Sequence, residues 1–367
     1  MGQVVLVTGV SRYLGGRMAR LLTEDPSIDR VIGVDVIPPR ADIGRAEFVR
    51  ADIRNPIIAK VINAASVDTV VHMGVIATPV QAGGRMSMKE INVIGTMQLL
   101  AACQKSPSVR RLVVKSTTSV YGAGPRDPAM FAEEIEPRHS PSSGWAKDSV
   151  EVEAYVRGFA RRRPDVTVTT LRFANFIGPS VQTPMTSYFS LPAVPVVMGY
   201  DARLQFVHED DGLRAIHEAA AEDKPGLYNV AGDGILLLSQ AIRLAGRAPF
   251  PLLPPLIGLA GRAMISTGLA DFSPEQVRFL TYGRGVDTTR MREVLGFEPE
   301  YTTQEAFESF VAARGLNRIV HPDRVRSAEQ ALSSVMTSGV SSVMTSGMSS
   351  FVAAGVPSGW TSGGKGA

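Results

Sequence analysis

The chain opens with the stretch Val4-Val5-Leu6-Val7-Thr8-Gly9-Val10-Ser11-Arg12-Tyr13-Leu14-Gly15-Gly16, in which an apolar run leads directly into a glycine-containing turn. Apolar, mostly β-branched residues predict a strand that is buried on both faces. Gly9 permits a tight turn after this strand, and Gly15 lets the following helix pack closely on it. The N-terminus of that helix offers backbone N–H groups to a pyrophosphate. The stretch predicts a dinucleotide-binding turn, although an ordinary loop between strand and helix is the alternative for this motif alone.

The turn is irregular at one position. A Gly-x-x-Gly-x-x-Gly pattern that starts at Gly9 has its middle glycine at residue 12, where this chain has Arg12. Without that glycine we expect the backbone to approach the phosphates less closely. We nevertheless expect Gly9, Arg12, Tyr13, Leu14 and Gly15 to contact the cofactor.

A second short apolar run, Val31-Ile32-Gly33-Val34-Asp35, ends in a carboxylate at the spacing where dinucleotide-binding folds place the acceptor for the adenosine ribose hydroxyls. Asp35 therefore favours NAD, because a carboxylate repels the 2′-phosphate of NADP. Arg40 is the residue that would instead support NADP binding.

Strands and helices continue to alternate along the chain. Further strands are expected at residues 47–50 and 69–71, and helical periodicity is present at residues 57–65, 86–104 and 150–163. This alternation predicts an α/β fold with a doubly wound parallel sheet of the Rossmann type. The residues that directly follow the third and fourth strands are further expected cofactor contacts, namely Asp52, Ile53, Met73 and Gly74.

Composition and charge narrow the class of protein. The 367 residues are 44% hydrophobic and 20% charged, which is enough for a full α/β core and a second, smaller lobe. The net charge of +3 is small and its basic residues are scattered, so we expect neither nucleic acid nor a membrane as a partner. The single cysteine, Cys103, lies in an apolar helical stretch and is expected in the core. Because the first strand begins at the fourth residue, we expect no signal peptide and a cytoplasmic location.

The C-terminal stretch has a different composition. The segment Ser333–Gly339 recurs at residues 341–347 and more loosely at 349–355, a period of eight that fits neither a helix nor a strand. We predict a disordered Ser/Gly-rich tail over residues 326–367. A weak membrane or partner contact through Val, Met and Phe351 is the alternative.

Several motifs in order place the chain in a family. The stretch Val113-Val114-Lys115-Ser116-Thr117-Thr118-Ser119-Val120-Tyr121-Gly122 resembles the fifth strand and active-site loop of the extended short-chain dehydrogenases. This is the NAD-dependent epimerase/dehydratase family typified by UDP-glucose 4-epimerase. Residues 172–179, 206–211, 227–232, 287–290 and 295–299 resemble later motifs of the same family. The resemblance implies an NAD-binding domain at residues 1–180 with a return segment at 205–232, and a smaller substrate-binding lobe at 181–320.

In that family a tyrosine made acidic by a lysine four residues later removes the proton while hydride moves to the nicotinamide. The resemblance assigns the accompanying hydroxyl to Thr117 and the lysine to Lys147, which would also bond the nicotinamide ribose. The tyrosine position is occupied by Ser143. An aliphatic hydroxyl is a far weaker acid than a phenol, so Ser143 cannot replace the tyrosine and the catalytic acid/base of the family is absent from this position. Tyr121 and His139 are the nearest candidates to substitute for it.

The residues specify the substrate less fully than the cofactor. Asn175 matches a substrate-contacting position, whereas the family's diphosphate-binding arginine is replaced by Leu204 and Arg203 is one residue out of register. We expect no metal, because His208 and the three acidic residues after it coincide with a structural motif.

Three functions remain open on these residues: an enzyme that acts on a nucleotide sugar through NAD, an NAD(P)-dependent reductase of a more apolar alcohol or ketone, and a non-catalytic NAD-binding sensor or scaffold. Members of this family commonly form homodimers, so the resemblance implies a homodimer through the helices at 86–104 and 150–163.

Overall fold

The computed structural model describes residues 2–73, 76, 84–138, 140–253 and 273–316. The chain divides into two compact units, Met1–Ile319 and Val320–Ala367, and the description below concerns the first. Gly74, His139 and the predicted tail at 326–367 lie outside the described residues.

A seven-stranded sheet forms the centre of the unit. Its order is β11-β6-β5-β4-β1-β2-β3, and every neighbouring pair is parallel. The strands are β1 (Gln3–Thr8), β2 (Ile28–Asp35), β3 (Glu47–Arg50), β4 (Thr69–His72), β5 (Arg111–Thr117), β6 (Thr167–Phe173) and β11 (Gly226–Val230). The predicted doubly wound α/β fold is therefore confirmed, and four of its strands could be located from their apolar runs alone.

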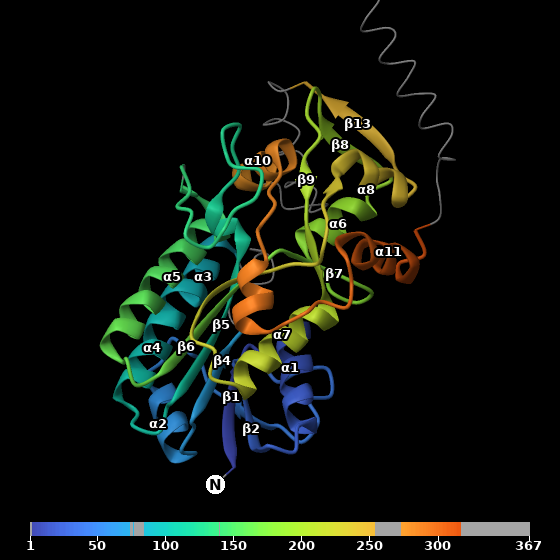
Figure 1. Ribbon diagram of the computed structural model, residues 1–367. Helices are drawn as coiled ribbons and strands as arrows, with labels where there is room; N and C mark the ends of the chain where they lie inside the picture. Colours follow the sequence, from blue (N-terminus) through green and yellow to red (C-terminus); the bar gives the residue numbers. More distant parts are fainter. Residues whose placement is uncertain (1, 74–75, 77–83, 139, 254–272, 317–367) are drawn as a thin grey trace, which may run out of the picture. The chain divides into compact units, whose positions relative to one another are not determined.

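Helices cover both faces of this sheet (Figure 1). One face carries α1 (Tyr13–Glu24) and α7 (Glu209–Ala221), and the other carries α2 (Ile57–Ala64), α4 (Thr96–Lys105) and α5 (Gly144–Arg162). A separate hydrophobic cluster fills each layer, as expected for strands that are apolar on both sides. Cys103 is fully buried in the layer under α4, as predicted, and burial raises the pKa of its thiol to about 12.

Two helix predictions need correction. The expected helix at 86–104 consists of α3 (Arg85–Lys89), a π-helical stretch η2 (Glu90–Gly95) and α4. The buried Asn92 side chain in η2 accepts a hydrogen bond from Ile76 N (2.8 Å) and donates to Ile76 O (3.0 Å), a tertiary contact that periodicity does not reveal. Helix α5 begins at Gly144, six residues before the expected start. Apolar periodicity missed its first turns because the charged residue Asp148 occupies a buried position there, where it pairs with Arg85.

Outside the two sheet layers, most of the remaining elements build a further hydrophobic core, the second cluster. Its buried members are Ala123, Ile177 and a set of residues that all follow residue 181. These elements include three two-stranded sheets: β7 (Asn175–Ile177) with β10 (Phe206–His208), β8 (Ala193–Val197) with β13 (Ala248–Leu252), and β9 (Arg203–Leu204) with β12 (Leu236–Leu237). The helices of this cluster are α6 (Pro184–Ser190), α8 (Leu238–Leu244), α10 (Pro274–Tyr282) and α11 (Thr303–Ala313). Of the other helical elements, η5 (Met291–Leu295) packs in the layer of α1 and α7, and η3 (Thr118–Tyr121) belongs to a small separate cluster with Phe131.

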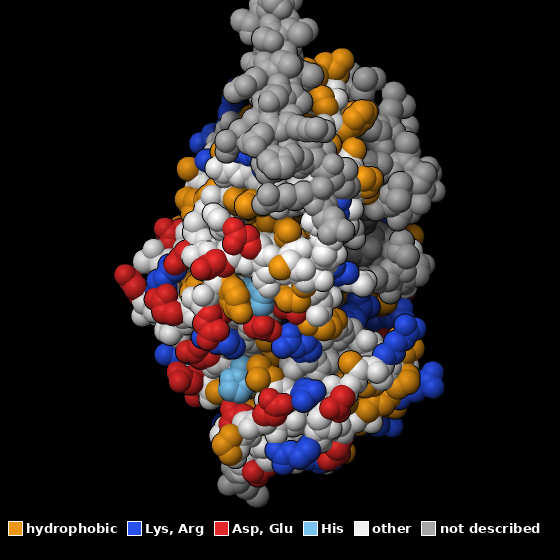
Figure 2. Space-filling view, turned by 90° about the vertical axis from the view of Figure 1, so that its right-hand side faces the viewer, with side chains coloured by type: hydrophobic (Ala, Val, Ile, Leu, Met, Phe, Trp, Pro, Cys, Tyr) orange, Lys and Arg blue, Asp and Glu red, His pale blue; other side chains and the backbone are white. Residues whose placement is uncertain are grey.

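The described surface has a mixed character. Acidic and basic side chains are interspersed over the face shown in Figure 2. Among the described residues, no helix combines the length and the apolarity that crossing a membrane requires.

Candidate functional site

The turn between β1 and α1 has the geometry that its glycines predict. Gly9 has a positive φ of 77°, which favours glycine. A Cβ atom on Gly15 would lie only 2.1 Å from the Gly9 carbonyl oxygen, so α1 packs directly on the turn. This close packing sets the first turn of α1 beside the glycine turn, where its backbone N–H groups can face a bound dinucleotide.

A cavity of about 610 Å³ opens at this turn. It lies at the carboxyl ends of the central strands, with Gly9 after β1, Met73 after β4, Thr117 at the end of β5 and Phe173 at the end of β6. In open parallel sheets this edge is where ligands bind. The cavity gathers eight of the predicted site residues: Gly9, Arg12, Tyr13, Leu14, Gly15, Met73, Thr117 and Asn175.

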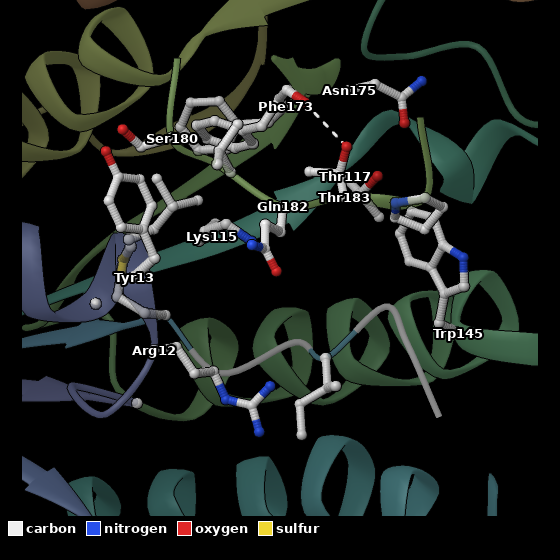
Figure 3. Close-up of a pocket in the computed structure, with 18 of the residues that line it drawn as sticks. Arg12, Tyr13, Lys115, Thr117, Trp145, Phe173, Asn175, Ser180, Gln182 and Thr183 are labelled. Atoms are coloured by element: carbon white, nitrogen blue, oxygen red, sulfur yellow. Dashed lines mark hydrogen bonds between the residues drawn. The ribbon is translucent and has the colours of Figure 1, made fainter. Parts of the chain in front are cut away.

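Figure 3 shows how the labelled side chains surround this space. Tyr13 stands at one side and Trp145 at the other, with Lys115 between them and Arg12 projecting below. The dashed line marks the hydrogen bond that the Thr183 hydroxyl donates to Phe176 O at 3.4 Å. Residues far apart in the sequence thus enclose one elongated site.

The two predicted acidic cofactor contacts do not line the cavity. Asp35 lies at the end of β2, where it accepts hydrogen bonds from Ser11 N (3.0 Å), Ser11 Oγ (2.5 Å) and Val36 N (2.7 Å). It therefore holds the glycine turn in place. Asp52 pairs with Arg54 at 2.6 Å, and hydrogen bonds from Arg54 lower the pKa of its carboxyl. The neighbouring Ile53 packs against η2, close to Gly95.

The start of α5 places its predicted catalytic residues outside the cavity. Ser143 is the N-cap residue of α5, and Lys147 is exposed on the outer side of the helix. Trp145 lines the cavity in their place, and Asp148 is fully buried against Arg85. Thr117 is the one member of the predicted triad that faces the cavity.

Thr117 caps a helical turn and also lines the cavity. Its side-chain oxygen accepts a hydrogen bond from Ser119 N at 3.1 Å and so caps η3. The same hydroxyl lines the cavity, with its proton available for a ligand oxygen. Asn175, at the start of β7, also lines the cavity, and Figure 3 shows it near Thr117.

Tyr121 does not substitute for the missing phenol. It is 1% exposed, stacks on Phe131 and donates a hydrogen bond to Asn229 Oδ1 at 2.8 Å. Burial raises the pKa of its phenol, the opposite of what a base requires. The suggestion that Tyr121 is the acid/base is therefore wrong, and its hydroxyl instead accepts a hydrogen bond from Arg172 at 2.8 Å.

Arg203 also lies away from the cavity. It belongs to β9, and its carbonyl accepts a hydrogen bond from Arg284 N at 2.9 Å. Gln205, which follows it by two residues, is buried and connects Gly232 O (3.1 Å) with Val286 N (2.8 Å). The departures from the family motif here are thus part of the packing of the second cluster.

The acidic stretch that begins at His208 serves the architecture. Glu209 is buried and accepts a hydrogen bond from the Tyr13 hydroxyl at 2.5 Å and from Val181 N at 2.7 Å. His208 stacks on Tyr301 with ring centroids 3.8 Å apart. In the part of the chain that the structure describes, no three His, Cys, Asp or Glu side chains are grouped as metal ligands.

Sequence reasoning missed the cationic character of the cavity. Its lining includes Arg12, Arg40 and Lys115, and among the described residues that line it there is no Asp or Glu. Burial lowers the pKa of Lys115 to about 8, and the nearby charge of Arg12 contributes to this shift. The available signal was strand alternation, because Lys115 is two residues before Thr117 and lies on the same face of β5.

Most of the chain matches a known protein family. Residues 5–231 match the description "NAD dependent epimerase/dehydratase family". The chain belongs to this family. An uncharacterized protein of Mycobacterium tuberculosis is 51% identical over 331 residues, which are 89% of this chain and 88% of the relative. The UDP-glucose 4-epimerase of Yersinia pestis is 28% identical over 185 residues, which are 47% of this chain and 53% of that enzyme.

Solved structures of epimerases share the fold of this family member. The UDP-glucose 4-epimerase of Thermotoga maritima with UDP-glucose matches with a TM-score of 0.66 and 20% identity, over 85% of this chain and 99% of the other. The UDP-glucuronic acid 4-epimerase of Bacillus cereus, in complex with UDP-glucuronic acid and NAD, matches with a TM-score of 0.66 and 17% identity, over 86% and 100% of the two chains.

Proposed function

We propose that this protein binds NAD and acts on the sugar of a nucleotide sugar by hydride transfer. The observation that carries the proposal is one continuous cavity that extends from the glycine turn, at Gly9 and Gly15, to Thr117 and Asn175. NAD, when bound, supplies the hydride acceptor and donor. The first turn of α1, which the absence of a side chain at Gly15 lets pack directly on the glycine turn, fits the pyrophosphate of such a cofactor. The known family relatives with nucleotide-sugar substrates support the choice of substrate class.

The chain's own residues would orient the sugar at the end of the cavity opposite the turn. Thr117 would donate a hydrogen bond from its hydroxyl to the reacting oxygen of the sugar, because one lone pair of that hydroxyl already accepts from Ser119 N and its proton has no partner among the described residues. Asn175 and the exposed amide of Gln182 would bond other hydroxyls of the sugar. Trp145 would exclude water from one end of the site.

The proton of the reacting hydroxyl lacks a phenol to receive it. Ser143 stands at that position, and Lys147 points to solvent. We therefore expect slow interconversion of UDP-glucose and UDP-galactose by the wild-type protein. General acid/base catalysis contributes about 10² to 10⁴ in rate, so Ser143→Tyr should raise turnover by that order when Lys147 turns from solvent toward the new phenol, and should give no gain when Lys147 stays in solvent.

The test combines binding with turnover. Calorimetric titration with NAD and NADP should show tighter binding of NAD, the cofactor of the matched family, although Arg40 lines the cavity and Asp35 does not. A coupled assay with both UDP-hexoses should detect the gain in Ser143→Tyr. Tighter binding of NADP would contradict the cofactor assignment. Rapid turnover by the wild type would show that another group is the base.

A second function is favoured by the same two observations at Ser143 and Lys147. A protein that binds NAD as a sensor or scaffold needs the glycine turn but no acid/base. Tight NAD binding without any gain of turnover in Ser143→Tyr would support this function.

A further inference from the structure

We propose that Arg12 and Lys115 form a two-cation clamp for the diphosphate that joins the two halves of the cofactor, in place of the close backbone approach that a glycine at position 12 would allow. This inference rests on the proposed function, because it assumes a dinucleotide in the cavity. It gives Arg12 and Lys115 charge-based binding roles that the family motifs do not predict.

The first observation concerns Arg12. It is the N-cap residue of α1, with extended backbone (φ −93°, ψ 154°), and its side chain lines the cavity. Within the described residues its guanidinium makes neither a hydrogen bond nor an ion pair. The nearest opposite charge is Asp35, whose oxygens are already bonded to Ser11 and Val36. Burial lowers the pKa of Arg12, and the charge of Asp35 offsets this effect only in part, so the guanidinium is incompletely compensated.

The second, independent observation concerns Lys115, on a different element. Its ammonium lies 5.6 Å from the ring centre of Phe176, and among the described residues no carboxylate or hydrogen-bond acceptor pairs with it. The main charge that acts on it is the like charge of Arg12. Two partly desolvated cations therefore repel each other across a cavity whose described lining contains no acidic side chain.

A diphosphate satisfies this arrangement better than a single carboxylate. Its two negative charges match two cations, and the N–H groups at the start of the twelve-residue α1 add further donors on the same side. Arg12 also explains how the turn functions without its middle glycine: a guanidinium reaches across the distance that the backbone does not span.

The diphosphate of a nucleotide sugar has the same chemistry as that of the cofactor. We assign the clamp to the cofactor because Arg12 belongs to the glycine turn, and because Figure 3 shows Lys115 between Tyr13 and Thr117, not at the Trp145 end.

Calorimetry on Arg12→Gln, Lys115→Met and the double variant tests the clamp, with NAD, ADP, UDP and adenosine as separate probes. Removing either charge-assisted hydrogen bond should weaken NAD and ADP binding roughly 10- to 100-fold, and adenosine binding should change less than about 2-fold. Lys60→Met, on the exposed side of α2, is the matched control and should leave every affinity unchanged.

The probes separate the clamp from the proposed function. Unchanged NAD and ADP affinity in both single variants overturns the clamp. Losses confined to UDP overturn its assignment to the cofactor. If both cations contribute to ADP binding but the wild type binds NADP more tightly than NAD, the clamp stands and the NAD assignment of the proposed function fails.

A pH series with Lys115→Arg gives a readout that a misfolded variant cannot imitate. The groups that act on Lys115 are Arg12 from α1, His72 from β4 and the ring of Phe176 from β7. Burial lowers the pKa of His72 to about 4, so it stays neutral at pH 7 to 9.5. Wild-type affinity for NAD should therefore fall as the pH rises through about 8, by up to about tenfold per pH unit, whereas Lys115→Arg should give a flat profile. Equal profiles for the two proteins would overturn the role of Lys115.

Discussion

Replacing Glu153 by leucine removes the carboxylate that balances a buried guanidinium beneath the candidate site. Glu153 lies on α5 and accepts hydrogen bonds from Arg172 Nε (2.9 Å) and Nη2 (2.6 Å). It also accepts a bond from the hydroxyl of Ser116, a residue of the cavity wall, at 2.6 Å. Burial alone would lower the pKa of Arg172, but the hydrogen bonds and charge of Glu153 raise it above the ordinary value.

The expected loss follows from this burial. The two side chains are 4% and 9% exposed, so the variant leaves a guanidinium charge without water or a counter-ion. Breaking one partner of a buried pair costs about 3 to 5 kcal/mol in the free energy of unfolding. Replacing both residues, as in Glu153→Leu with Arg172→Met, should cost much less than the sum of the two single variants, because an apolar pair leaves no orphan charge.

Urea unfolding followed by circular dichroism measures these differences. The matched control is Glu47→Leu, which breaks a bond of similar geometry between Arg30 and Glu47 (2.8 and 2.6 Å) whose side chains are 44% and 52% exposed. That loss should be below about 1 kcal/mol. A loss in Glu153→Leu as small as in the control, or additive effects in the double variant, would refute the reasoning.

Three further predictions concern the turn, the pH dependence and the tail. Gly15→Ala places a Cβ 2.1 Å from Gly9 O, so it should abolish measurable NAD binding and lower the free energy of unfolding by about 1 to 3 kcal/mol. The control Gly158→Ala in α5 should leave NAD binding unchanged, and retained binding in Gly15→Ala would contradict the turn geometry. His72 has a pKa lowered by burial from 6.5 to about 4, so the unfolded chain binds more protons between these values and the free energy of unfolding should fall by roughly 3 kcal/mol from pH 7 to pH 4. His72→Gln should lack this part of the slope in urea unfolding over the same pH range, and identical slopes would count against it. Ending the chain after Arg326 should leave circular dichroism and NAD titration unchanged, since the removed residues lack the composition of a core; loss of solubility or binding would show that they pack.

How far the site could be predicted depended on the kind of contact each residue makes. The glycine turn depends on local backbone geometry, so Gly9 and Gly15 and the neighbouring residues lie at the cavity as the sequence indicated. Lys147 shows the opposite case. Lys147 occupies its expected position in the motif. Its neighbour Asp148 turns inward and pairs with Arg85, 63 residues away, and in this orientation of the helix Lys147 is exposed to solvent.

The sequence by itself determined the architecture and the family. Apolar strand runs that alternate with periodic helices favour a parallel sheet with helices on both sides, because both faces of such strands must be covered. Those patterns are local, and they can be located along the chain without any knowledge of distant contacts.

Only the tertiary structure decided which charges meet in the cavity. Arg12 and Lys115 are separated by about a hundred positions in the printed sequence, and each has an ordinary local explanation, one as a helix-capping position and the other as a strand residue. Their mutual repulsion, and the absence of acidic residues from the described cavity lining, arise because the sheet brings the ends of β1 and β5 to the same edge. Electrostatic interactions depend on separation in space and on burial, and neither is encoded in separation along the chain.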